Sequence, residues 1–195
     1  MNVTVLAGGV GAARLLRGLV TAVDPGSVTA VVNVADDDVI HGLHVSPDLD
    51  TITYTCAGEI DAERGWGLAG ESWHAMESLR RYSGSAGRSD IGWFNLGDRD
   101  LGTHMYRTSR RREGAPLSTI TAEIASAWNL GFTMIPVSDD PIATRIATDD
   151  LGELSFQEYF VREHHDVAAT AVRFVGVDDA RPAPGVIEAI EQADV

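Results

Sequence analysis

The stretch from Asn33 to Thr51, NVADDDVIHGLHVSPDLDT, decides the fold. It follows an apolar run, 29–32, that predicts a buried strand, and it leads through a loop to Ser46-Pro47. Serine as N-cap and proline at the first helical position are typical of a helix start. Ligands of α/β folds bind where the parallel strands end. We therefore expect this loop to lie at the ligand-binding edge of a sheet.

The same stretch concentrates acidic residues around one loop. Its carboxylates repel each other unless a cation or a cationic ligand group lies among them. Any single aspartate at a strand end or in a first helical turn can simply be solvated. The group as a whole favours a functional site, and its members are Asp36, Asp37, Asp38, Asp48 and Asp50.

The N-terminus predicts the first strand–turn–helix unit of a nucleotide-binding α/β fold. A short β-branched strand, 2–6, runs into a glycine turn that contains Gly8, Gly9 and Gly11, and an amphipathic helix follows over 12–23. Amides at the start of such a helix can bind phosphate. The third glycine of the usual dinucleotide fingerprint is replaced by Arg14, and tight helix–strand packing explains the glycines nearly as well.

Further along, a second polar cluster opens a helix that we expect to run to about residue 112. Asp98 is a reasonable N-cap for it, and Asp98 with Arg99 can either cap and salt-bridge or face a ligand, with Thr103 and His104 one turn on. A glycine-rich loop over 61–70 presents Trp66. His164-His165-Asp166 superficially resembles a metal site, although adjacent histidines after a polar helix are more often exposed.

The remaining pattern predicts an α/β domain with a Rossmann-like three-layer sandwich, a mostly parallel sheet and a small α/β insertion. Helices are expected over 48–57, 71–82, 118–129, 156–162 and 184–193; strands over 133–137, 142–148 and 172–177; a hairpin insertion from 142; and a loop over 83–89.

Composition limits the partners. The chain has 195 residues with a net charge of −14, which argues against nucleic acid or an anionic membrane as the main partner. The single Cys56 cannot form an internal disulfide, and no apolar run reaches the length of a membrane span. We expect a reducing, cytoplasmic setting and, by base rate, a possible homodimer.

Several motifs together resemble one family. VLAGGVGAARLLRGL at the N-terminus, VVNVADDDVIHGLHVSPDLDT, RGWGLAGESW and WFNLGDRDLGTH are similar to the phospholactate transferases of deazaflavin coenzyme F-420 biosynthesis. Small departures are Ala12, Ala35 and Gly102. Members of this family look much longer, so the resemblance implies that residues 1–195 form a single α/β domain that is the N-terminal part of a longer fold.

The resemblance implies a transferase, dependent on Mg²⁺, that moves a phospholactyl or phosphoenolpyruvyl group from a guanosine diphosphate-linked donor to the deazaflavin Fo and releases GMP. It implies that Asp36, Asp37, Asp48 and Asp50 hold Mg²⁺ or orient the acceptor hydroxyl, one of them serving as base. The donor phosphates would lie near Gly8, Gly9 and Gly11. The deazaflavin would lie near Asp98, Arg99, Thr103 and His104.

Two other classes stay open. A relative of the same superfamily could bind a nucleotide or sugar nucleotide as a regulator without chemistry. A plain NAD-dependent dehydrogenase is disfavoured by Arg14 and by the absence of an obvious hydride-site residue.

Overall fold

The central element is a parallel sheet whose strands are ordered β1-β2-β5. The computed structural model describes residues 1–88 and 91–195. β1 (Val3–Ala7), β2 (Val28–Val32) and β5 (Thr133–Pro136) are each short runs rich in β-branched or apolar residues. They pair in register from Val3 opposite Val28 and from Thr29 opposite Thr133. All carboxyl ends therefore meet at one edge.

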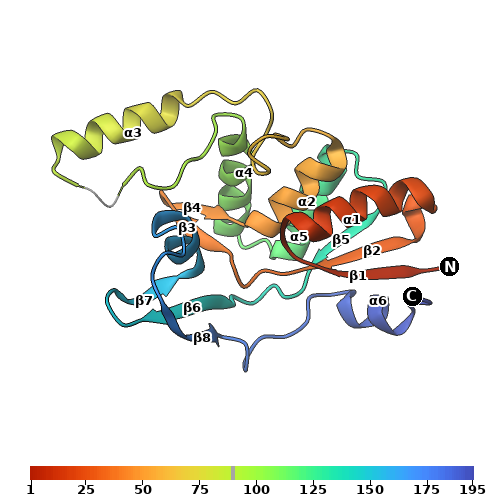
Figure 1. The fold of residues 1–195 in the computed structure, drawn as a ribbon. Helices are drawn as coiled ribbons and strands as arrows, with labels where there is room; N and C mark the ends of the chain where they lie inside the picture. Colours follow the sequence, from red (N-terminus) through yellow and green to blue (C-terminus); the bar gives the residue numbers. More distant parts are fainter. Residues whose placement is uncertain (89–90) are drawn as a thin grey trace.

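Helices cover both faces of this sheet, which confirms the predicted three-layer α/β architecture (Figure 1). On one face lie α1 (Gly9–Ala22), α2 (Pro47–Ala57) and α5 (Leu117–Ala127), and on the other lies α6 (Val186–Glu191). The helix-side core takes alternate strand residues such as Ala30 and Val32, whereas Val31 packs with Ala183 and Val186 on the opposite face. A strand buried on both faces is what a parallel sheet requires.

A small hairpin interrupts the loop between β2 and α2, where the sequence predicted only loop. β3 (Asp38–Ile40) and β4 (Leu43–Val45) pair antiparallel, with Ile40 opposite Leu43. The hairpin packs on α3 (His74–Ser85) and α4 (Asp100–Arg112) in a second core centred on Met76. The loop predicted over 83–89 is wrong up to Ser85, which is still helical, and Ser89 lies outside the described residues.

The predicted hairpin insertion is present and larger than expected. β6 (Ala143–Thr148) pairs antiparallel with β7 (Gly152–Ser155) and, on its other side, with β8 (Ala169–Val175). Between β7 and β8 lies the π-helical turn η2 (Glu158–Arg162). A 3-10 turn, η1 (Pro25–Ser27), precedes β2. Figure 1 shows this second sheet lying beside the carboxyl edge of the parallel one.

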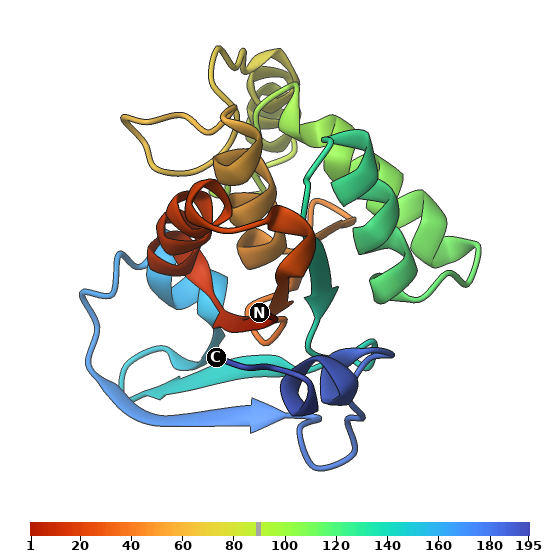
Figure 2. The same ribbon diagram turned by 90° about the vertical axis from the view of Figure 1, so that its right-hand side faces the viewer.

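The two chain ends lie close together (Figure 2). The Asp194 amide donates to the Asn2 carbonyl at 2.8 Å, and the Thr4 amide donates to the Val195 carbonyl at 3.0 Å. Residues after α6 therefore lie along the outer edge of β1. Among the described residues, no helix is long and apolar enough to cross a membrane.

Candidate functional site

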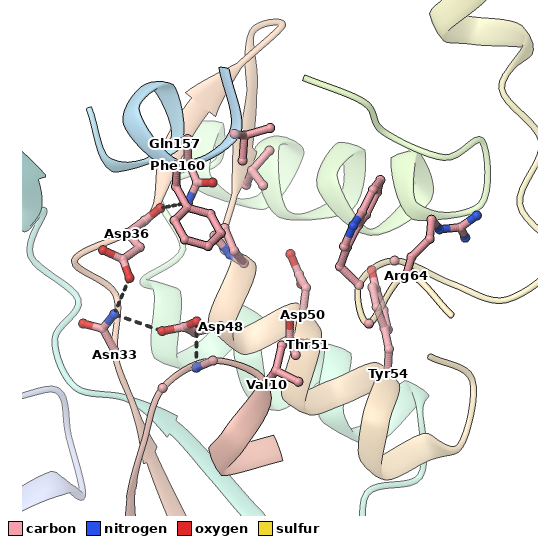
Figure 3. Close-up of a pocket in the computed structure, with 18 of the residues that line it drawn as sticks. Val10, Asn33, Asp36, Asp48, Asp50, Thr51, Tyr54, Arg64, Gln157 and Phe160 are labelled. Carbon is pink, nitrogen blue, oxygen red and sulfur yellow. Dashed lines mark hydrogen bonds between the residues drawn. The ribbon is translucent and has the colours of Figure 1, made fainter. Parts of the chain in front are cut away.

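A cavity of about 1250 Å³ opens at the carboxyl ends of β1 and β2, at the edge that the sequence predicted. Its walls come from the turn after β1, the first turns of α2, the loop 62–67, the start of α4 and the η2 segment. Figure 3 shows carboxylates on one side of it and Tyr54 with Arg64 on the other. The cavity therefore joins parts of the chain that are more than a hundred residues apart.

Asn33 joins two of the predicted acids at the cavity wall. Its side-chain amide, at the end of β2, donates to Asp36 Oδ2 at 3.1 Å and to Asp48 Oδ2 at 2.9 Å. Asp36 also accepts from the Thr144 hydroxyl at 3.0 Å. Burial raises the pKa of both carboxyl groups, and the charge of Asp48 adds to the shift of Asp36. Two half-buried, mutually repelling carboxylates in a cavity are suited to hold a cation.

The glycine turn after β1 contacts Asp48 directly. The Gly9 amide at the start of α1 donates to Asp48 Oδ1 at 2.8 Å, and a Cβ on Gly8 would lie 3.2 Å from Asp48 Oδ2. Gly9 also has a φ of 65°, which favours glycine. Gly8 and Gly9 line the cavity, whereas Gly11 does not. In this structure, Gly8 and Gly9 therefore allow the Asp48 carboxylate of α2 to approach the backbone closely.

Asp37 and Asp50 each bind a partner of their own, so the structure does not group the four predicted acids around one position, and their shared role in holding Mg²⁺ stays a prediction. Asp37 accepts from the Ser46 hydroxyl at 2.6 Å, and burial raises its pKa to about 8. That hydroxyl consequently makes no capping bond to α2. Asp50 is buried against Arg107, with two guanidinium nitrogens directed at its carboxylate. Within the described residues, no three histidine, cysteine, aspartate or glutamate side chains are grouped to hold a metal ion.

One wall of the cavity is a buried polar network formed by residues of α2 and α4. His104, 1% exposed, places Nε2 3.1 Å from Asp100 and Nδ1 3.7 Å from Asp50. The Tyr54 hydroxyl donates to Asp100 at 2.6 Å. Although burial acts in the opposite direction, His104 and Tyr54 hold the pKa of Asp100 below its usual value. Tyr54, Asp50, Asp100 and His104 all line the cavity, so the network fixes the surface on which a ligand would lie.

Asp98 does not cap α4, and this expectation is wrong. Its carboxylate accepts from the Ser72 hydroxyl at 2.6 Å and from the amides of His74 and Ala75, at the start of α3. Glu71 instead caps α4.

The cap of α4 is Glu71, a residue that precedes α3. The Glu71 carboxylate accepts from the amides of Arg99 and Asp100 at 2.8 and 2.9 Å. The Arg99 guanidinium donates to the Ala69 carbonyl and to Glu59. Asp98, Arg99 and Thr103 do not line the cavity. Asp98 and Arg99 hold the loop 59–73, and it is this loop that presents Trp66 and Arg64 to the cavity.

The predicted helix 156–162 forms another wall. Phe156, Gln157 and Phe160 line the cavity, and the Gln157 amide donates to the Asp36 carbonyl at 3.0 Å. His164 and His165 are exposed, as the sequence indicated.

Comparison with known proteins decides the family. A family model described as 2-phospho-L-lactate transferase CofD matches residues 3–195. The chain belongs to the CofD family. Two proteins named phosphoenolpyruvate transferase, from Streptomyces avermitilis and Nocardia farcinica, are 47% and 45% identical to it over 100% and 99% of the chain. The chain spans 60% and 58% of their lengths.

A solved structure supports the fold alone. A member of the UPF0052 family from Bacillus halodurans superposes with a TM-score of 0.60 at 21% identity, covering 99% of this chain and 56% of that protein.

Within this CofD-family chain, sequence reasoning missed several cavity residues. Asn33 and Arg14 stand inside motifs that were singled out for their acids and glycines, so their polar side chains were the available signal. Tyr54 and Gln157 carry no such signal, because only the fold brings them to the cavity. Arg107 reads in sequence as one of a basic run, yet it is 2% exposed and pairs with Asp50.

Proposed function

We propose that this protein transfers a phosphoenolpyruvyl group from a guanosine diphosphate-linked donor to the deazaflavin Fo and releases GMP. The observation that carries the proposal is the carboxylate pair Asp36 and Asp48, joined through Asn33 in a cavity at the carboxyl edge of the parallel sheet. An enolpyruvyl rather than a lactyl group is favoured because the similar curated proteins are named phosphoenolpyruvate transferases.

The carboxylate pair fits Mg²⁺. This ion is typically bound by one or two carboxylates, several waters and the phosphates of the substrate, rather than by a complete protein cage. Asp36 and Asp48 both face the cavity, and the raised pKa of each reflects a negative charge that burial leaves poorly compensated. Mg²⁺ bound there would neutralise charge on the donor diphosphate.

The chain's own residues would position the reactants. The acceptor hydroxyl oxygen attacks the phosphorus that carries the enolpyruvyl group, the bond from that phosphorus to the bridging oxygen breaks, and GMP leaves with the oxygen. The hydroxyl proton passes to a carboxylate of the pair.

Arg14 is the cation that we assign to the donor phosphates. It lines the cavity from α1, and its guanidinium makes no hydrogen bond or ion pair with any other residue that the structure describes. The charges of Asp50 and Arg107 already neutralise each other. This pair therefore stabilises the wall of the cavity and does not compensate the charge of a ligand.

The test is GMP release from the enolpyruvyl donor in the presence of Fo and Mg²⁺. We expect release by the unmodified protein, its loss with a chelator, its restoration by added Mg²⁺, and its loss in Asp48→Asn. Asp149→Asn, an exposed turn residue, is the matched control and should retain the activity. Tight nucleotide binding without GMP release would overturn the proposal in favour of a regulator. Equal rates with the lactyl donor would overturn the preference for enolpyruvate.

A further inference from the structure

The segment from Phe156 to His165, which we call the aromatic segment, carries features that the proposed chemistry does not use. Phe160 lines the cavity and is 52% exposed, so its ring is accessible from the cavity. Apolar side chains that line a polar cavity commonly contact the apolar part of a ligand. We therefore expect Phe160 to contact an apolar group of a ligand.

Three rings of this segment lie nearly parallel. The centroids of Phe156 and Phe160 are 5.6 Å apart with 7° between their planes, and those of Phe160 and His165 are 5.3 Å apart with 18°. Parallel rings at such separations are offset rather than superposed. Because Phe160 also lines the cavity and is 52% exposed, part of its side chain stays accessible from the cavity.

The backbone that holds these rings is unusual. η2 is a π-helical turn, and His164 and His165 both have a φ of 51°, which non-glycine residues seldom adopt. Such conformations persist only where surrounding contacts enforce them, and they cluster at ligand sites.

Two sets of contacts fix the segment to the rest of the molecule. Gln157 donates to the Asp36 carbonyl, which sets Phe160 beside the carboxylate pair (Figure 3). Arg162, which pairs inside the segment with Glu158 at 2.8 Å, lies over the ring of Trp93 outside it, 5.6 Å from the ring centroid. The rings are thus held in place before any ligand arrives, which favours tight binding.

We propose that the aromatic segment is a stacking platform for a flat heteroaromatic ring, bound against the uncovered part of Phe160. The inference rests on the proposed function for its two candidate ligands, since both the deazaflavin acceptor and the guanine of the donor carry such a ring. The platform adjoins Asp36, so the ring that it holds belongs to a ligand whose other end reaches the carboxylate pair.

The test compares binding of three probes: Fo followed by its fluorescence, and GDP and riboflavin by calorimetry. Phe160→Leu keeps an apolar side chain and removes the ring, whereas Phe160→Tyr keeps the ring. Phe174→Leu is the matched control, because Phe174 on β8 is 54% exposed and lies outside the cavity. Loss of one aromatic–base stack weakens binding roughly 5- to 150-fold.

We expect Phe160→Leu to weaken one probe by a factor in that range, which identifies the ring, while Phe160→Tyr and Phe174→Leu stay within about twofold of the unmodified protein. The platform is refuted if Phe160→Leu binds every probe normally, if Phe160→Tyr or Phe174→Leu loses as much as Phe160→Leu, or if the unmodified protein binds none of the probes. Binding that depends on Phe160 without any GMP release would leave the platform standing and refute the proposed transfer.

Discussion

Asp48→Asn and Asp50→Asn remove the same charge from the first turn of α2, and the structure predicts that their effects separate. Asp50 is 6% exposed and its carboxylate compensates a guanidinium, that of Arg107, which is 2% exposed. Asp48 lies at the cavity wall, where Asn33 joins it to another carboxylate, that of Asp36, which its charge repels. We therefore expect Asp50→Asn to act on stability and Asp48→Asn to act on transfer.

The magnitude follows from the burial of the pair. Removing one partner of a buried ion pair costs roughly 3–5 kcal/mol, because the other charge stays buried and uncompensated. Asparagine keeps one acceptor for Arg107, so about 3 kcal/mol is expected, which for a chain of this size lowers Tm by roughly 6–12 °C. Asp48→Asn loses one hydrogen bond to Asn33 but relieves repulsion with Asp36, so a change of about 1 kcal/mol or less is expected.

Thermal melts followed by circular dichroism measure the first effect, and GMP release measures the second. Asp149→Asn again serves as the control for loss of an exposed charge. A melting temperature of Asp50→Asn within about 2 °C of the unmodified protein would refute the assignment of Asp50 to a buried structural pair. Near-normal transfer by Asp48→Asn would refute the assignment of Asp48 to the transfer reaction.

Three further outcomes are expected. Hydrogen bonds from the Ser72 hydroxyl and then from the Ala75 amide lower the pKa of Asp98. The contribution of Asp98 to stability is therefore complete above the ordinary aspartate pKa and is lost as the pH falls through the lowered value. Melting curves below neutral pH should show this dependence, and Asp98→Asn should lack it. A Cβ at position 97 would overlap Glu71, so Gly97→Ala should expel the α4 cap and cost about 0.5–2 kcal/mol in urea unfolding, with no additional loss when it is combined with Glu71→Ala. Gly8→Ala should push the Asp48 carboxylate aside and reduce kcat for GMP release while Tm changes little; an unchanged kcat would show that the close approach of Gly8 to Asp48 does not matter.

Local sequence signals were enough for the elements that define the architecture. Ser46-Pro47 and Gly58 do bound α2, the latter with a φ of 77°, and the apolar run before Asn33 is a buried strand of the parallel sheet. The hairpin was missed because its strands have three residues each and its turn, with φ of 53° at His41 and 78° at Gly42, uses a histidine where asparagine or aspartate would have given the signal.

The site was only partly predictable, because spacing along the chain places carboxylates together without saying what compensates them. Asp50 meets Arg107 from across 57 positions, and no local pattern links the two. Asp98 is a second example. It lies in the sequence where the N-cap of α4 would lie, but its carboxylate accepts from amides at the start of another helix, α3.

That exchange of carboxylates between α3 and α4 has a consequence for how the molecule opens. The first turn of each helix is satisfied by an acid that precedes the other, Asp98 for α3 and Glu71 for α4, so neither end can fray without exposing amides at both. The two helix starts should therefore open as one cooperative unit, with the amides of His74, Ala75 and Asp100 losing hydrogen-exchange protection together. The loop that carries Trp66 runs directly into Glu71 and is held by Arg99 through the Ala69 carbonyl and Glu59, so this wall of the cavity would be released in the same event.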